Sequence, residues 1–227
     1  MSEQIRSLWQ GIRLEFPLLV GVFPFGMIYG AAALSSGLTA AQAQSMSSIV
    51  FAGSAQFLTA QLIHTAAPAL VIIGTIAIVN LRHVLYSASV APYVQHLPLR
   101  WKALLAYLLT DEAYAATIVH YEEAGIAPTG HWLFLGAGAS LWLTWQVSTA
   151  LGIFLGTTIP DQWPLEFALP LVFIAMLVPM LKDRPLVAAA LAAGVVALLG
   201  AALPYKLGLV LAALVGVSVG LIAEGRR

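Results

Sequence analysis

Long apolar runs separated by short polar stretches make up most of this sequence. No charged residue occurs between Phe16 and Leu81. One membrane crossing needs about 20 apolar residues, so this stretch alone has room for about three crossings. Similar runs continue as far as Ile222. The pattern predicts an all-α, polytopic membrane helix bundle.

Ser, Gly, Pro and charged residues mark the ends of the apolar runs. We expect one transmembrane domain over residues 1–227, with a cytoplasmic N-terminal segment at 1–15, a core at 16–181 and two C-terminal helices within 182–227. The predicted membrane segments are residues 16–34, 44–64, 68–91, 103–121, 132–157, 165–181, 186–203 and 207–222.

The basic residues near both chain ends favour cytoplasmic termini. Eight crossings satisfy both ends, but they place Arg100 and Lys102 on the outside. One re-entrant or broken helix would remove this conflict. Segment 44–64 is the candidate, because Gly53 and Ser54 lie at its centre. Seven crossings therefore stay open beside eight.

The first six predicted segments form two triplets, and each triplet has a member with a polar interruption. Inverted repeats of three plus three helices with interrupted members recur in secondary transporters. The pattern is compatible with such a 3+3 inverted repeat containing broken helices.

Composition agrees with a membrane protein. Of the 227 residues, 60% are hydrophobic and 9% are charged, and the mean hydropathy is +0.91, whereas soluble domains carry about 25% charged residues. The net charge of zero offers no basic surface for nucleic acid. The absence of cysteine excludes disulfides, thiolate metal sites and cysteine nucleophiles. Since no H-E-x-x-H, P-loop or G-x-G-x-x-G motif is present, we expect neither a metal nor a cofactor.

Asp111 and Glu112 are adjacent carboxylates in the interior of the fourth predicted segment. A charge at mid-bilayer costs at least ~2.5–3.5 kcal/mol, so such residues indicate function, and one or both could carry a proton. Alternatively, one of them forms a structural ion pair with Arg82. Tyr107 and Tyr114, at i−4 and i+3 from Asp111, could hydrogen-bond it.

Gly53, Ser54 and Gln56 interrupt the second predicted segment. Unwinding there would expose backbone N–H groups and a positive helix N-terminus, which suits a carboxylate. The alternative is hydrogen bonding between helices, worth roughly 0.6–2 kcal/mol per contact. We favour function for Ser54 and Gln56, and hydrogen bonding between helices for Ser47 and Gln61.

Asn80, His83 and Ser87 are spaced i, i+3 and i+7 in the third predicted segment, so a continuous helix would place them on one face. Arg82 points elsewhere, and snorkelling to the interface is one explanation for it. His83 is either a satisfied polar residue or a group for proton exchange near neutral pH.

Pro24 and Gly26 lie inside the first predicted segment. They indicate either a hinge or broken helix beside a site, or a kink that serves packing.

Four of these stretches together resemble the AzlC family, the large subunit of bacterial branched-chain amino acid exporters. They occur in the order expected for that family within residues 24–123, while the C-terminal half matches only in length and hydrophobicity. The stretches are P-F-G at Pro24–Gly26, M-S-S-I-V-F-A-G-S-A-Q-F at Met46–Phe57, V-N-L-R-H-V-L-Y-S-A-S at Val79–Ser89 and L-L-T-D-E-A-Y-A at Leu108–Ala115.

The resemblance implies export of valine, leucine, isoleucine or other hydrophobic amino acids across the bacterial inner membrane, driven by an ion gradient. It also implies a small, separately encoded AzlD-type membrane subunit. Under this hypothesis residues 16–181 are a transport core, a carboxylate binds the substrate ammonium, and a helix break binds its carboxylate. Phe25, Phe51 and Phe57 would surround its side chain.

The expected substrate-binding residues are Gly53, Ser54, Gln56, Asn80, Asp111, Glu112 and Tyr114, and the expected proton-coupling residues are Asp111, Glu112 and His83. This requires the second, third and fourth segments to meet around one polar cavity. An alternative hypothesis is an intramembrane enzyme with Ser54 as nucleophile and His83 as base. A weaker one is a membrane assembly factor without transport activity.

Overall fold

The computed structural model describes residues 2–125, 127–156, 181, 183–203 and 207–225. These residues form helices and no strand, so the all-α prediction is confirmed for them. Two compact units are formed, one by the described residues 2–60 and 79–156 and the other by residues 61–78 and those from 181 onward. The helices are α1 (Glu3–Ser35), α2 (Ala40–Ile49), α3 (Gly53–His64), α4 (Ala69–Val79), α5 (Leu81–Val94), α6 (Leu99–Tyr107), α7 (Asp111–Ala124), α8 (Gly130–Gly156), α10 (Arg184–Leu199) and α11 (Leu207–Glu224).

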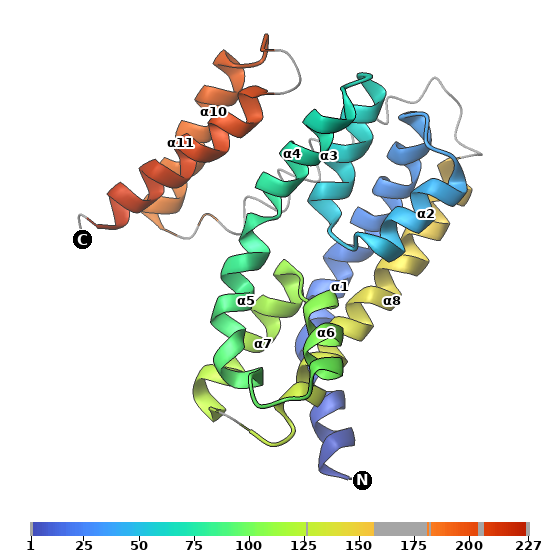
Figure 1. Ribbon diagram of the computed structural model, residues 1–227, viewed down its shortest axis with the longest axis vertical. Helices are drawn as coiled ribbons and strands as arrows, with labels where there is room; N and C mark the ends of the chain where they lie inside the picture. The colour runs from blue at the N-terminus through green and yellow to red at the C-terminus, as the bar shows by residue number, and fades with distance from the viewer. Residues whose placement is uncertain (1, 126, 157–180, 182, 204–206, 226–227) are drawn as a thin grey trace. The chain divides into compact units, whose positions relative to one another are not determined.

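Helices α1 and α8 run side by side and make the most extensive helix–helix packing of the first unit (Figure 1). A Cβ atom on Gly11 would lie 1.9 Å from the Leu133 carbonyl oxygen, and one on Gly152 would lie 2.0 Å from the Met27 carbonyl oxygen. Small residues permit this close approach, as at many membrane helix interfaces. Residue numbers rise together along both helices, so α1 and α8 are parallel.

Pro24 does not break the first helix. α1 continues from Glu3 to Ser35 through both of its prolines, so the broken-helix interpretation of this position is wrong. A Cβ atom on Gly26 would lie 2.0 Å from the Ser148 hydroxyl oxygen, so Gly26 serves close packing against α8. The hinge at Pro24 and Gly26 stays a prediction.

Three predicted segments each consist of two shorter helices. Residues 50–52 separate α2 from α3, which confirms the break expected beside Gly53. The other two breaks were not expected. Asn80 separates α4 from α5, and residues 108–110 separate α6 from α7. The predictions of continuous helices over 68–91 and 103–121 are therefore wrong.

Local chemistry explains the start of α7. The Thr110 hydroxyl accepts a hydrogen bond from the Ala113 N–H at 3.3 Å, which caps the new helix. Asp111 and Glu112 then occupy the first turn, where negative charge complements the helix dipole. These two residues therefore lie at a helix beginning and not inside a helix.

Helices α6 and α7 form a hairpin beside α8. Trp101, early in α6, packs on Trp132 with ring centroids 5.1 Å apart. Tyr107, at the end of α6, accepts a hydrogen bond from Trp142 Nε1 at 2.7 Å. Late in α7, Tyr121 returns to the start of α8 and donates to the Gly130 carbonyl at 3.0 Å. The fourth predicted segment thus reverses its direction between α6 and α7 (Figure 1).

The limbs α2 and α3 form a second hairpin. Tyr29 of α1 donates to the Ala43 carbonyl near the start of α2 at 3.2 Å. The ring of Tyr29 also packs edge-on against Phe57 of α3, with centroids 5.4 Å apart. The start of α2 and the first half of α3 therefore both lie beside Tyr29 of α1. This arrangement is expected for a re-entrant segment.

The hairpins remove the conflict over loop charges. Trp101 packs on Trp132 in the first turn of α8, and Gly11 of α1 packs against the same part of α8. Arg100 and Lys102, on either side of Trp101, therefore lie at the end of the unit where the basic start of α1 lies.

The second unit contains the C-terminal pair α10 and α11, which pack on each other. The side chain of Asp183 caps α10 by accepting from the Leu186 N–H at 2.9 Å. These helices match the last two predicted segments, whereas residues 165–180 of the sixth lie outside the described residues. Within the described part of the chain, two stretches are long and apolar enough to span a membrane, Glu3–Ser35 and Ala69–Val94.

Candidate functional site

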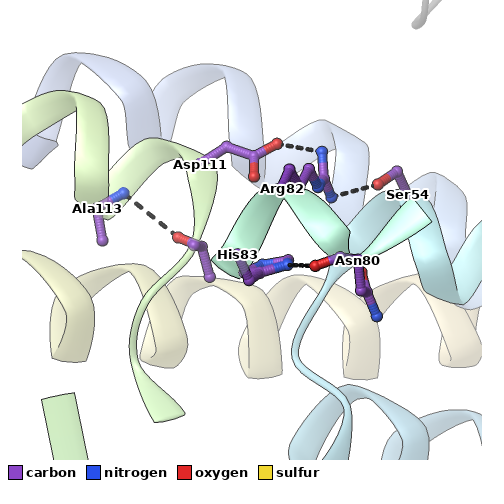
Figure 2. A network of polar contacts seen from close by, with 7 residues as sticks. Ser54, Asn80, Arg82, His83, Asp111 and Ala113 are labelled. Atoms are coloured by element: carbon purple, nitrogen blue, oxygen red, sulfur yellow. Dashed lines mark hydrogen bonds and ion pairs between the residues drawn. The ribbon is translucent and has the colours of Figure 1, made fainter. Parts of the chain in front are cut away.

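Three polar residues from three helix beginnings meet at one point. The Arg82 guanidinium forms an ion pair with Asp111 and donates a hydrogen bond to the Ser54 hydroxyl at 2.5 Å (Figure 2). Ser54 is the second residue of α3, Arg82 is the second residue of α5, and Asp111 is the first of α7. The three polar stretches of the sequence thus converge where the chain breaks its helices.

The ion pair decides between the two interpretations of Arg82. Its guanidinium is paired with Asp111, so the contact expected from the ion-pair alternative is present. The side chains keep 29% and 38% of their surface exposed for Arg82 and Asp111 respectively, so a small ligand can reach both.

Hydrogen-bonding capacity is left over around this pair. Asp111 Oδ1, Arg82 Nε and Asn80 Oδ1 are buried and have no hydrogen-bond partner among the described residues. Buried polar atoms are nearly always satisfied, so such atoms need an explanation. Two of them are acceptors and one is a cationic donor. At the ion pair itself, Asp111 Oδ1 can accept from an ammonium and Arg82 Nε can donate to a carboxylate.

Asn80 lies at the junction of α4 and α5, three residues before His83. The shared face predicted for these two residues stays a prediction. The Asn80 side chain makes no capping bond. The His83 ring nitrogen Nδ1 contacts the Asn80 backbone carbonyl at 3.3 Å. His83 is partly exposed, and its role in proton coupling stays a prediction.

Gln56 is fully buried, and its side-chain amide is hydrogen-bonded to other residues of the chain. Its Oε1 accepts from the Ala52 N–H at 3.2 Å and from Trp145 Nε1 at 3.1 Å, and its Nε2 donates to the Ser47 hydroxyl at 3.0 Å. Ser47 also bonds Thr149 of α8 at 2.9 Å, which confirms the hydrogen bonding between helices predicted for Ser47. The geometry favours a structural role for Gln56, whose substrate role stays a prediction.

Tyr107 and Tyr114 do not hydrogen-bond Asp111. Tyr114 donates to the Ser89 hydroxyl at 3.0 Å, and Tyr107 donates to the Ser48 carbonyl. The expectation from helical spacing is wrong for Tyr107 because the break places it in α6. The substrate-binding role of Tyr114 stays a prediction.

An aromatic wall lies beside the break before α3. Phe25 and Phe57 pack with ring centroids 4.7 Å apart, and both are buried. A Cβ atom on Gly53 would lie 3.1 Å from Phe25 and from Trp145, so glycine lets the start of α3 approach these rings. Phe51 is buried too and adopts a φ of 44°, in the left-handed region, within the break itself.

Glu15 is a buried carboxyl group that the sequence pattern did not single out. It was placed in a cytoplasmic segment, but α1 already begins at Glu3 and Glu15 is fully buried. Its position directly before the apolar residue Phe16 was the available signal.

A family model described as AzlC protein matches residues 17–159, which is more than half of the chain. The chain belongs to the AzlC family. The matched range holds the helix breaks, Ser54, Arg82 and Asp111, and it leaves out α10 and α11.

Relatives of this AzlC-family protein are named as membrane proteins, which supports a membrane location. An uncharacterized membrane protein of Archaeoglobus fulgidus is 31% identical and covers 91% of each chain. The inner membrane protein YgaZ of Escherichia coli is 26% identical over 78% of this chain and 75% of its own. No solved structure matches the chain at a significant level.

Proposed function

We propose that this AzlC-family protein is a secondary transporter that exports branched-chain or other hydrophobic amino acids across the bacterial inner membrane, coupled to protons. The observation that carries the proposal is the unfilled hydrogen-bonding capacity around the Arg82–Asp111 ion pair. Family membership and the membrane-protein names of the relatives support a transport-related role in a membrane.

The ion pair offers a way to bind a zwitterion by exchange. The substrate ammonium takes the place of Arg82 on Asp111 and also finds the free acceptor of Asn80. The substrate carboxylate binds Arg82 and the Ser54 hydroxyl. Breaking a buried pair is costly when one charge is left alone. Here each charge gains a new partner, so the exchange avoids that cost.

Helix dipoles assist the same exchange. The N-termini of α3, α5 and α7 meet at Ser54, Arg82 and Asp111. Each N-terminus is equivalent to roughly +0.5 elementary charge. Broken helices that point positive ends at a substrate carboxylate are a recurrent device of secondary transporters.

The aromatic wall supports the proposal that the substrate has a hydrophobic side chain. Phe25, Phe51 and Phe57 are buried beside the start of α3. Such a surface discriminates poorly between aliphatic chains, because one methylene is worth only about 1–3 kcal/mol. We therefore expect valine, leucine and isoleucine all to be accepted.

The topology proposals follow from the two hairpins. The α2–α3 hairpin and the α6–α7 hairpin lie toward opposite ends of α8, which supports an inverted repeat. The count of seven to eight membrane segments stays a prediction. We also propose a small AzlD-type membrane subunit as partner. The exposed apolar residues of α5, which include Leu81, Val84 and Leu85, offer surface to that subunit or to lipid.

The intramembrane-enzyme alternative gains no support from the geometry. The Ser54 hydroxyl accepts from Arg82, and the His83 ring contacts the Asn80 backbone. Among the described residues, no hydrogen bond joins Ser54 to His83.

A transport assay tests the proposal. Cells producing the protein with and without the small subunit are loaded with labelled valine, leucine, isoleucine and a polar amino acid, and the loss of label is followed. We expect faster loss of the three aliphatic amino acids. Asp111→Asn should slow export at least about tenfold, since a hydrogen bond to a charged group contributes about 1.5–3 kcal/mol. The exposed Glu123→Gln on α7 is the matched control. Unchanged export in both Asp111→Asn and Glu112→Gln would remove the coupling role.

A further inference from the structure

The tips of the two hairpins, which are the residues at and beside their helix breaks, contact each other through Tyr107. This residue ends α6, directly before the break at residues 108–110, and its hydroxyl donates a hydrogen bond to the Ser48 carbonyl near the end of α2. Its ring also packs on Phe51, in the break at residues 50–52, with ring centroids 6.0 Å apart. The two helix breaks are therefore neighbours in the first unit.

Helix α8 holds both tips near its middle. Trp142 Nε1 donates to the Tyr107 hydroxyl at 2.7 Å, and Gln146 Nε2 donates to the Ser47 carbonyl at 3.1 Å. Trp142 and Gln146 are about one turn apart in the central part of α8. Since the two hairpins lie toward opposite ends of α8, they meet at their tips.

The first break creates the acceptor that Tyr107 uses. In a continuous helix the Ser48 carbonyl would accept from the Ala52 N–H, but that N–H donates to Gln56 Oε1 at 3.2 Å. An unpaired carbonyl is costly in a membrane, so the Tyr107 hydroxyl stabilises the end of α2. A side-chain hydroxyl can leave this acceptor without unwinding either helix. Tyr107 is also 40% exposed, so another donor can reach the same carbonyl when the hydroxyl leaves.

This contact lies beside the proposed substrate site. Ser54 is the second residue after the first break, Asp111 is the first residue after the second break, and Arg82 contacts both. We propose that Tyr107 is a gating residue, whose bond to the Ser48 carbonyl holds the two tips together beside this site, and that the tips part when substrate passes. The inference rests on the proposed function for the identity of the substrate, whereas the parting of the tips is measurable without transport.

Reversible cross-linking tests whether the tips must part. The natural chain has no cysteine, so a full-length variant with Ser48→Cys and Tyr107→Cys can be joined by a short bifunctional methanethiosulfonate reagent and released by a reductant. We expect joining to stop export of labelled valine and the reductant to restore it. Ser7→Cys with Thr129→Cys is the matched control, because these hydroxyls are hydrogen-bonded at 2.8 Å between α1 and the residue before α8. Joining the control pair should leave export unchanged.

Thiol labelling of the first break provides a measurement without transport. Ala52→Cys lies at a buried position in this break, so a hydrophilic maleimide should react with it faster when the tips part. Adding Tyr107→Phe, which removes only the hydroxyl, should raise the labelling rate about two- to tenfold, as expected for the loss of one hydrogen bond. Tyr121→Phe is the control, because its hydroxyl also donates to a backbone carbonyl, at 3.0 Å, but at the start of α8. It should leave the labelling rate unchanged.

The outcomes separate the alternatives. Export by the joined tip variant at the rate of the released variant overturns the proposal, as does an equal block by the control pair. Equal labelling of Ala52→Cys with and without Tyr107→Phe also overturns it. If the tip variant with two cysteines does not fold, the labelling rates alone decide. Absence of amino-acid export by the wild type, together with faster labelling in Tyr107→Phe, removes the proposed function and leaves the gate standing.

Discussion

Arg82 and Asp111, 29 residues apart in the sequence, form an ion pair that joins the first turn of α5 to the first turn of α7. Both residues follow a break in the helical structure. The pair therefore fixes two helix beginnings relative to each other, and a ligand that opens it releases both. The same contact serves the fold and the proposed exchange with substrate.

Reversing the pair separates these two roles. Arg82→Asp and Asp111→Arg should each destabilise the protein by about 1–3 kcal/mol, since each breaks the ion pair and brings two like charges together. The double variant should recover much of this stability because the charges again attract. Export should stay at least about tenfold below wild type, since a positive charge at position 111 no longer accepts the substrate ammonium.

Thermal unfolding in detergent and export of labelled valine are the two measurements for these variants. Ser54→Ala, which removes one hydrogen bond and no charge, is the milder comparison. Wild-type export by the double variant would show that the pair is purely structural.

The Gln56 amide should matter more for stability than for transport selectivity. Gln56→Leu leaves the Ala52 N–H and Trp145 Nε1 without their partner and removes one of the two hydrogen bonds of the Ser47 hydroxyl. Each buried group left unsatisfied costs about 1–3 kcal/mol, so the midpoint of thermal unfolding should fall. The same substitution at Gln4, which is exposed on α1, should leave the midpoint unchanged. Equal midpoints for both variants would contradict the network.

The α1–α8 interface should reject even one methyl group. Gly152→Ala places a Cβ atom 2.0 Å from the Met27 carbonyl oxygen, and backbone cannot move aside as a flexible side chain can. We expect a clear loss of folded protein after extraction in mild detergent, measured by size-exclusion chromatography. Gly21→Ala is the matched control, because no atom lies within 4 Å of its added Cβ. That variant should be neutral or slightly stabilised, since alanine favours helix over glycine by about 1 kcal/mol.

The membrane sidedness of α6 distinguishes the hairpin fold from a series of straight crossings. The natural chain has no cysteine, so single cysteines report sidedness directly. Leu99→Cys and Gln4→Cys should react with a membrane-impermeant maleimide from the same side, which the positive-inside rule makes cytoplasmic. Ala41→Cys, at the start of α2, should react from the other side. Reaction of Leu99→Cys and Ala41→Cys from one side would contradict the hairpin arrangement of the described chain.

The helical fold and the unusual polar residues could be predicted from local sequence alone. Hydrophobicity over tens of residues sets a cost for exposure to water, and that cost does not depend on the partner. The apolar runs therefore predicted an all-helical fold in the described residues. Polar residues are costly when they face lipid, so Ser54, Arg82 and Asp111 stood out together with the four stretches that resemble the family.

The sequence did not show which of these polar residues contact one another. The sequence predicted one helix through Asn80 and another through Asp111, because apolar residues continue on both sides of each position. The threonine cap and the return of α7 along α8 break that continuity. Those breaks bring Arg82 to Asp111, and they separate Tyr107 from the helix of Asp111.

The sequence by itself determined that this chain is helical, which of its residues are expensive in a membrane, and the family it resembles. Only the tertiary structure decided which polar residues meet, that Glu15 is buried, and that Arg100 lies at the end of the unit where α1 begins. The physical reason is that burial cost is a property of each residue. Direction after a helix break is set by packing against α1 and α8, which lie far away in the sequence.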